Sequence, residues 1–295
     1  MMATAITTGT DGQLIEAFAL HLRTQKDYSP RSIRSYLADL GQFSRYLNQS
    51  NPTVSLLAVT QATTLGYYCS LEPTCRSNTL RKKLAILRRF YRFCVETRRL
   101  SVNPLAEIPL PKFKKGEISF LETAEFETLL TGLNTETFVG CRDRAIIGLI
   151  GESGVTVQEL KNLNLADLDF AARTLTVVSQ RKKKGSPRRQ LALTAHLHLI
   201  LQAYLDQRAK HPGATDEQTA LILDSNGQRI SNRGIDRRIR RATQRAGLTR
   251  KVSAQRLRHS FAVRQRRAGR SLTELRELLG LGDIAIVSRL YSGVS

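Results

Sequence analysis

A proline-containing segment at residues 103–116 divides this chain of 295 residues into two parts. The segment reads NPLAEIPLPKFKKG, and its three prolines and basic cluster are incompatible with a continuous helix. An extended course between two compact units is therefore expected. The chain length, at about 150 residues per domain, also fits two domains. We predict a helical domain over residues 10–103, a linker over residues 104–118 and a second domain over residues 119–295.

Apolar residues at helical spacing run through the first hundred residues. They predict four helices, over residues 14–22, 33–47, 60–69 and 77–94. Ser29 and Pro30 precede the second stripe and are expected to be its N-cap and first helical residue. The other face of the fourth helix is expected to be exposed, with six cations and no acid: Arg81, Lys82, Lys83, Arg88, Arg89 and Arg92.

The second domain is expected to be mainly helical, with a small β-hairpin. Helices are predicted over residues 123–133, 136–153, 158–163, 196–210, 233–246, 253–268 and 272–279, followed by a short tail that ends at Ser295. Two strands, at residues 170–180 and 190–193, flank a turn rich in Lys and Arg, which indicates a hairpin with a cationic tip. The predicted fold class is mainly α with a small β-sheet.

The net charge of the chain is +21, from 46 Lys and Arg against 25 Asp and Glu. Arginine supplies 34 of these cations, and its planar guanidinium binds phosphate oxygens in pairs. Residues 226–270 contain 14 Arg, one Lys and one Asp, so this stretch alone carries a net charge of +14. A merely soluble basic surface would intersperse its charges by sign. A nucleic acid is therefore the expected partner.

Several classes of protein are not expected from this sequence. The N-terminal residues lack the order of a secretory signal, and the longest uncharged stretch, residues 46–71, is too polar to span a bilayer. Four cysteines without CxxC spacing or neighbouring histidines indicate reduced, mostly buried thiols of a cytoplasmic protein. The chain has no phosphate-binding loop, dinucleotide fingerprint or metal-ligand spacing, so no cofactor or metal is expected.

Several motifs follow one another in an order that resembles the tyrosine recombinases, the phage-integrase and Xer-like family. They are GVTVQEL at residues 154–160, Lys184-Gly185 on the hairpin, SAQRLRHSFA at residues 253–262, LLG at residues 278–280, and Tyr291. SPRSIRSY at residues 29–36 is similar to the start of that family's core-binding domain. The resemblance covers essentially the whole chain. It implies an N-terminal helical core-binding domain and a C-terminal mixed α+β catalytic domain that clamp duplex DNA.

The resemblance implies a role for each matching residue. Tyr291 matches the nucleophile that attacks a scissile phosphate, and the 3′-phosphotyrosyl bond it forms conserves the phosphodiester energy without ATP. Arg258 matches an arginine that binds the non-bridging phosphate oxygens. Lys184 matches the lysine that protonates the leaving 5′ oxygen, and Glu159 matches an acid that supports the site. The family resemblance also implies a homo-tetramer on two paired DNA sites.

Contacts with the DNA backbone are expected from three cationic places in the sequence. These are the predicted fourth helix, the hairpin tip and the basic stretch at residues 226–270. The candidate residues are Arg81, Lys82, Arg88, Arg89, Arg92, Lys182, Lys183, Arg237, Arg238 and Arg241.

Three positions depart from the family pattern. Thr156, Gln255 and Leu281 stand where the family has arginine, histidine and histidine. Thr156 can instead cap the short helix with Glu159, three residues on, and Leu281 can pack inside the domain. Gln255 can donate a hydrogen bond but is a poor proton carrier. Another cation can replace the missing arginine, and the nearby candidates are Arg142, Arg144 and Arg256.

Three functions remain open from the sequence. The first is a recombinase that cuts and rejoins DNA strands through Tyr291. The second is a catalytically impaired relative that binds specific DNA as a regulator or accessory factor. The third is an RNA-binding basic protein, although the chain lacks the aromatic-rich strand motifs of an RNA-recognition fold.

Overall fold

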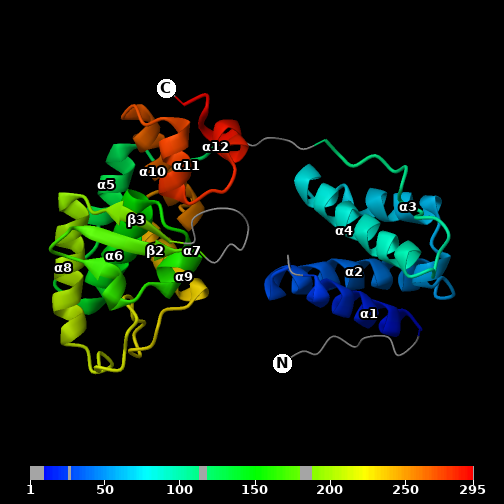
Figure 1. Cartoon of the computed structure of the whole chain (residues 1–295), viewed down its shortest axis with the longest axis horizontal. Helices are drawn as coiled ribbons and strands as arrows, with labels where there is room; N and C mark the ends of the chain where they lie inside the picture. The colour runs from blue at the N-terminus through cyan, green and yellow to red at the C-terminus, as the bar shows by residue number, and fades with distance from the viewer. Residues whose placement is uncertain (1–9, 26–27, 113–117, 180–187, 295) are drawn as a thin grey trace. The chain divides into compact units, whose positions relative to one another are not determined.

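The computed structural model describes residues 10–25, 28–112, 118–179 and 188–294. The chain divides into two compact units, residues 1–116 and 117–295 (Figure 1). Lys182, Lys183 and Lys184, which the sequence analysis assigned to the hairpin tip, lie outside the described residues.

The first unit is helical, as predicted. It contains α1 (Thr10–Thr24), α2 (Pro30–Ser50), α3 (Gln61–Leu71) and α4 (Ser77–Glu96), with a short 3-10 helix at Leu56–Ala58. The Ser29 side chain accepts a hydrogen bond from the backbone N–H of Ser32, and Pro30 is the first helical residue. Both predictions for the start of α2 are therefore confirmed.

Residues that follow α4 belong to the core of the first unit. Leu105 and Ile108 are buried with the apolar side chains of the four helices. The Arg88 guanidinium donates hydrogen bonds to the carbonyl oxygens of both residues, and Arg81 donates to that of Pro111. Residues 104–112 of the predicted linker therefore pack on the N-terminal unit, because their apolar side chains complete that core. Ile118, at the other end of the predicted linker, packs against an apolar cluster of the second unit.

The second unit is built from eight helices and a small sheet within its described residues. The helices are α5 (Thr123–Thr131), α6 (Phe138–Ser153), α7 (Val157–Asn162), α8 (Ala195–Ala209), α9 (Asn232–Arg245), α10 (Ala254–Arg267), α11 (Leu272–Leu279) and α12 (Ile284–Tyr291). The antiparallel strands β1 (Leu168–Asp169), β2 (Thr174–Val178) and β3 (Arg188–Ala192) lie in the order β1-β2-β3. A 3-10 helix at Leu165–Asp167 precedes β1.

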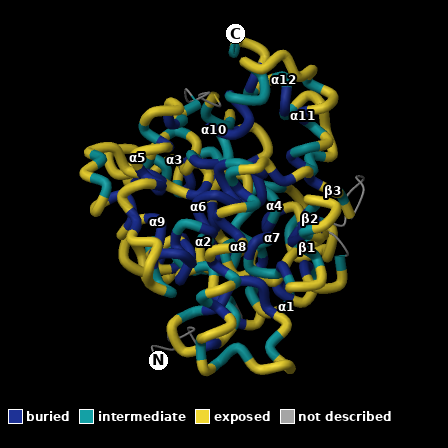
Figure 2. The backbone as a smooth tube through the Cα atoms, turned by 90° about the vertical axis from the view of Figure 1, so that its left-hand side faces the viewer, coloured by how far each residue is buried: buried dark blue, intermediate teal, exposed yellow. Residues whose placement is uncertain are grey.

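Helix α6 is the central element of the second unit. It contacts α8, α9 and α10, and Figure 2 shows it buried along its length. It contains three glycines, Gly140, Gly148 and Gly151, which allow neighbouring groups to approach closely. A Cβ at Gly151 would lie within 2.5 Å of the Phe126 ring, for example. The helix is therefore the scaffold on which the C-terminal helices pack.

The structure corrects two predictions for the second unit. The strand predicted over residues 170–180 begins only at Thr174, because residues 170–173 form a turn in which Arg173 adopts a left-handed backbone (φ 51°). The residues predicted as a tail form helix α12, capped by the Asp283 side chain. Val287 and Tyr291 of α12 are buried in a small apolar cluster with residues of α10 and α11.

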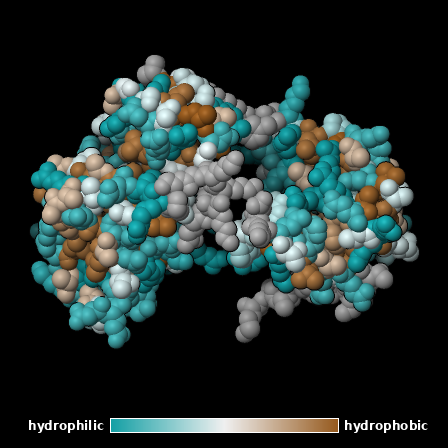
Figure 3. Space-filling view, in the orientation of Figure 1, coloured by the Kyte–Doolittle hydropathy of each residue, from teal (hydrophilic) through white to brown (hydrophobic). Residues whose placement is uncertain are grey.

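All four cysteines are free thiols, but only two of them are buried. Cys94 and Cys141 are buried, Cys75 is half-buried and Cys69 is exposed, so the prediction of mostly buried thiols holds for half of them. Hydrophilic residues cover most of the face seen in Figure 3. Within the described part of the chain, no helix combines the length and apolar character needed to cross a membrane.

Candidate active site

Helix α10 presents Arg258 to a narrow space between the ends of two other helices. Leu257 and Phe261 are buried, so Arg258 points away from that core side of the helix. Its guanidinium donates hydrogen bonds to the carbonyl oxygens of Gly154, after α6, and Leu279, at the end of α11. Gly154 is needed there because its φ is +66° and a Cβ would clash with the Phe261 ring.

Glu159 lies beside Arg258 and is held by the start of α7. The Thr156 hydroxyl accepts a hydrogen bond from the backbone N–H of Glu159 (3.2 Å), and the Glu159 carboxylate accepts from the backbone N–H of Thr156 (2.8 Å). This reciprocal capping box confirms the structural role predicted for Thr156. Position 156 therefore orients Glu159 and supplies no positive charge.

A second guanidinium, from Arg189 of β3, occupies the other side of Glu159. Its two terminal nitrogens lie 2.7 Å and 3.2 Å from the Glu159 carboxylate oxygens, and its Nε donates to the carbonyl of Leu278. The Arg258 guanidinium lies 3.7 Å from the same carboxylate. Glu159 thus lies between two arginines. The side chains of all three residues are at most 14% exposed.

The electrostatics of Glu159 follow from this arrangement. Burial would raise the pKa of its carboxyl group, but the hydrogen bonds and charge of Arg189, the Thr156 N–H and the charge of Arg258 together lower it below the usual value. Glu159 is therefore ionised at neutral pH. One negative charge accompanies two positive charges, which leaves this cluster net positive and suited to an anion.

Arg189 was not among the cations that the sequence suggested as replacements for the missing arginine. Of those candidates, Arg142 is 0% exposed and donates to the Asp143 carboxylate. The charge of Arg144 acts on the Cys141 thiol, and Arg256 lines a separate pocket at the start of α10. Strand alternation could have identified Arg189, because it shares the inward face of β3 with buried Leu191. Gly280 permits its close approach, since a Cβ there would lie 2.5 Å from its guanidinium.

Tyr291 is the last residue of α12 and is 2% exposed. Its hydroxyl oxygen lies 2.5 Å from Nδ1 of His259, which follows Arg258 on α10. Burial raises the pKa of Tyr291 to about 12, and the positive charge of Arg258 opposes that rise. The positive charge of Arg258 therefore acts on the Tyr291 hydroxyl.

His259 also contacts Gln255, one turn earlier on the same helix. The side-chain amide nitrogen of Gln255 lies 3.2 Å from Nε2 of His259. Burial and the charge of Arg258 both lower the pKa of His259, so its imidazole is neutral at pH 7. The sequence did not single out His259, because the histidine of the family pattern falls on position 255.

Leu281 packs at the edge of the apolar cluster that contains Tyr291 and Val287. This confirms the structural role that the sequence analysis considered for Leu281. The side chain contributes no polar group to the site. It follows Gly280, whose left-handed conformation ends α11 and turns the chain toward α12.

The cationic face predicted on α4 differs from the expectation. Only Lys82 and Arg92 of its six cations are exposed. Asp39 of α2 faces this side of α4, with its carboxylate 3.7 Å from the Lys82 Nζ and 2.7 Å from that of Lys83.

Three arginines of the same face bind other parts of the first unit. Arg81 and Arg88 donate to backbone carbonyls after α4. Arg89 donates to the Gln25 side chain and stacks over the Tyr28 ring. Several cations that the helical pattern placed on the surface therefore form contacts within the first unit.

Helix α9 carries the predicted basic residues of the second unit. Arg237 and Arg241 are exposed, one turn apart. Arg238 is 9% exposed, lies 3.9 Å from the Asp143 carboxylate and donates to the Ser225 hydroxyl, so it does not lie on the exposed face. The helix therefore presents one basic face to solvent and inserts one arginine into the domain.

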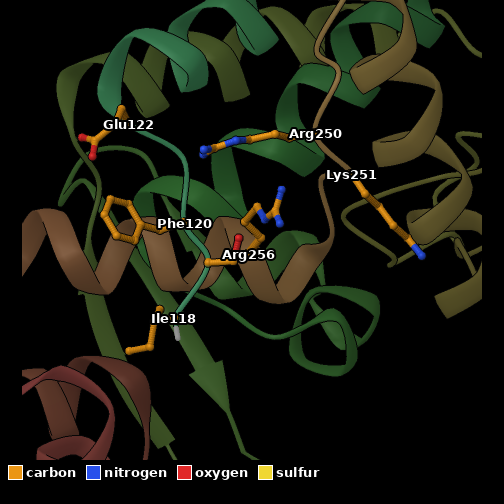
Figure 4. Close-up of a pocket in the computed structure, with 7 residues that line it drawn as sticks. Ile118, Phe120, Glu122, Arg250, Lys251 and Arg256 are labelled. Carbon is orange, nitrogen blue, oxygen red and sulfur yellow. The ribbon is translucent and has the colours of Figure 1, made fainter. Parts of the chain in front are cut away.

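A basic pocket lies at the start of α10, shown in Figure 4. Arg250 and Lys251 come from the loop that precedes α10, and Arg256 comes from its first turn. Arg250 points toward the segment that carries Phe120 and Glu122, whereas the end of the Lys251 side chain points away from it. The lining also includes Phe120 and one acid, Glu122, so the three cations leave the pocket with a net positive charge.

Comparison with known proteins gives a consistent result. The Phage integrase family matches residues 119–295, and its N-terminal SAM-like domain matches residues 15–97. Tyrosine recombinase XerC from Myxococcus xanthus is 32% identical over 279 residues, covering 94% of this chain and 91% of that protein.

Two solved structures share the fold. The Tn1549 transposon integrase in complex with transposon right end DNA is 16% identical with a TM-score of 0.75, covering 96% of this chain and 95% of that chain. A lambda integrase tetramer bound to a Holliday junction is 15% identical with the same TM-score, covering 94% and 76%. With both parts of the chain matched in the family's own order, this protein belongs to the phage integrase family.

Proposed function

We propose that this protein is a tyrosine-type site-specific recombinase, which cuts and rejoins strands of double-stranded DNA through Tyr291. The observation that carries the proposal is the meeting of Tyr291, from α12, with Arg258 and His259, from α10. The Tyr291 hydroxyl contacts His259, and the charge of Arg258 acts on it. The DNA-bound integrases of similar fold and the XerC relative support the same activity.

The proposed reaction is a transesterification. The Tyr291 oxygen attacks the scissile phosphorus, the bond from phosphorus to the 5′ oxygen breaks, and a 3′-phosphotyrosyl bond forms. The 5′ oxygen leaves with a proton, which we assign to Lys184. Rejoining reverses these steps, with a 5′ hydroxyl as the attacking group. Because one ester replaces another, no nucleotide cofactor is required.

Arg258 and Arg189 are proposed to stabilise the phosphate together. Each guanidinium is held in place by a backbone carbonyl near the end of α11 and by the Glu159 carboxylate. Guanidinium groups held in advance can donate to the non-bridging oxygens as their charge develops, without reorganising at that moment. Arg189 then supplies the positive charge that Thr156 lacks.

The exposed cations of α9 and the pocket at the start of α10 are proposed to bind the DNA backbone. Arg237 and Arg241 of α9 are exposed, and Arg250, Lys251 and Arg256 line the pocket. Lys182 and Lys183, next to Lys184 in the sequence, join this proposal. In the complex of similar fold, lambda integrase is a tetramer on a Holliday junction. We propose the same assembly for this chain, on two paired DNA sites.

The DNA affinity is expected to fall steeply with salt. Binding of backbone phosphates releases counterions, so the logarithm of the association constant should fall linearly with log salt, by about 0.9 for each phosphate neutralised. Arg237→Ala and Arg241→Ala should each reduce that slope by about 1, whereas Lys210→Ala, at the end of α8, should leave it unchanged. Fluorescence anisotropy from 50 to 300 mM NaCl measures the slope, and a salt-independent affinity would contradict backbone binding.

Strand cleavage is tested with DNA that traps the covalent intermediate. Duplexes are first selected for binding from a random library and then nicked near the centre of the bound site, so that the cleaved fragment diffuses away. A denaturation-resistant adduct is expected on gels. If bound duplexes give no adduct at any nick position, the protein is instead a DNA-binding accessory factor. If a structured RNA displaces all duplexes, it is an RNA-binding protein.

A further inference from the structure

We propose that His259 accepts the phenolic proton of Tyr291 during strand cleavage, with Gln255 orienting its imidazole ring. The inference rests on the proposed role of Tyr291 as nucleophile. It assigns proton transfer to a residue other than the one at position 255, where the family has histidine and this chain has glutamine. The three side chains form a continuous hydrogen-bonded row from an exposed residue to a buried one.

The geometry places His259 in contact with the atom that reacts. Its Nδ1 lies 2.5 Å from the Tyr291 hydroxyl oxygen, while the two ring planes are inclined by 57° with centroids 5.7 Å apart. The contact is therefore a hydrogen bond between a ring nitrogen and the hydroxyl, and the rings are not stacked. Two packed helices hold the partners, because α10 and α12 contact each other and share an apolar cluster.

The chemistry requires a base at this place. A phenol with a pKa of about 12 is ionised in only about one molecule in 10⁵ at pH 7. Tyr291 is 2% exposed, so bulk water has little access to its proton before DNA binds. A neutral imidazole in contact with the hydroxyl can take the proton as the oxygen attacks. Burial and the charge of Arg258 keep His259 neutral in the resting state.

Gln255 can determine which ring nitrogen carries the proton. The amide nitrogen of Gln255 lies 3.2 Å from Nε2, and a half-turn of the amide group brings its oxygen to the same place. In that orientation Gln255 accepts the Nε2–H and leaves the lone pair of Nδ1 facing Tyr291. The same oxygen stabilises the imidazolium that forms after transfer. Gln255 therefore acts as a positioning residue, which agrees with its inability to carry a proton itself.

Each proton that moves in this step has a named donor and acceptor. The Tyr291 O–H bond breaks as the oxygen–phosphorus bond forms, and the proton moves to Nδ1 of His259. The leaving 5′ oxygen receives a different proton, from the acid assigned to Lys184. On rejoining, the bond between phosphorus and the tyrosine oxygen breaks, and His259 returns its proton to that oxygen.

The test compares single-turnover cleavage of nicked DNA by His259→Gln, His259→Ala and the wild-type protein. Loss of a general base should slow cleavage by about 10²- to 10⁴-fold, while DNA affinity stays within about twofold. His196→Gln, on α8, is the matched control and should cleave at the wild-type rate. Wild-type cleavage by the His259 variants would overturn the inference, whereas absence of cleavage by the wild-type protein would overturn the proposed function first.

Two further readouts separate proton transfer from a structural role. From pH 7 to 9 the wild-type rate should be level, because His259 is already neutral, whereas the His259→Ala rate should rise about tenfold per pH unit as Tyr291 ionises by itself. A 5′-phosphorothiolate substrate, whose sulfur leaves without a proton, should restore Lys184→Ala but not His259→Ala. Equal pH profiles, or equal rescue of both variants, would contradict the assignment.

A variant of the exposed Gln255 provides a second test, which does not depend on whether the His259 variants fold. Gln255→Met removes the contact to Nε2 and should slow cleavage by about tenfold at pH 7, with unchanged DNA affinity. Circular dichroism checks that each variant is folded. If the His259 variants do not fold, a Gln255→Met protein with wild-type rate and pH profile overturns the proposal.

Discussion

Tyr291→Phe is expected to abolish the covalent adduct with DNA while the protein stays folded and bound to its site. Phenylalanine keeps the ring that packs with Val287 and the other apolar side chains of the C-terminal cluster. It removes only the oxygen, which is the proposed nucleophile. The substitution leaves Nδ1 of His259 without its partner, at a cost of about 1–3 kcal/mol in the free energy of unfolding.

Tyr204→Phe provides the matched control for this experiment. Tyr204 is also fully buried in the second unit, and its hydroxyl bonds the backbone of Leu221 and Leu223. The two variants should therefore lose similar stability, as measured by urea denaturation, but only Tyr291→Phe should lose the adduct. An adduct of normal yield with Tyr291→Phe would mean that another side chain is the nucleophile.

Arg189→Met is expected to lower the free energy of unfolding by about 3–5 kcal/mol, because it leaves the buried Glu159 carboxylate without its nearest cation. Arg189 and Glu159 are 10% and 8% exposed, and their closest atoms lie 2.7 Å apart. Arg258, at 3.7 Å, compensates only part of the charge. Urea denaturation of the full chain, followed by circular dichroism, measures the loss.

A double-variant cycle tests whether the loss comes from this pair. Glu159→Gln combined with Arg189→Met should cost less than the sum of the two single substitutions, with a coupling of about 0.5–3 kcal/mol. Arg267→Met is the control, because it breaks a pair with Glu122 of the same length on the exposed surface, and little change is expected. Additive losses in the cycle would show that Arg189 and Glu159 contribute independently.

Much of the fold could be predicted because it depends on local signals. Apolar stripes at helical spacing identified α1 to α4, and Ser29-Pro30 marked the start of α2. The capping role of Thr156 could be predicted from Glu159, three residues later. Helix α12 escaped prediction because it has only eight residues, several of them β-branched, and depends on packing against α10 and α11.

The candidate site was predictable only in part. The matched motifs identified Arg258 and Tyr291 as candidates, but charge counting could not separate exposed cations from buried ones. Arg142 of α6 and Arg238 of the basic helix α9 are both buried near Asp143. Arg88, on the predicted cationic face, instead binds carbonyl oxygens of the chain that follows α4.

The sequence by itself determined the two-part organisation, the helical class and the excess of positive charge, since each follows from residues close together in the chain. Only the tertiary structure decided which charges meet. Arg189 comes to Glu159 from a strand 30 residues away, and Tyr291 comes to His259 from a helix 32 residues away. Such contacts depend on how helices and strands pack in three dimensions. The number of cations therefore came from the sequence, and the arrangement around Glu159 and Tyr291 came from packing.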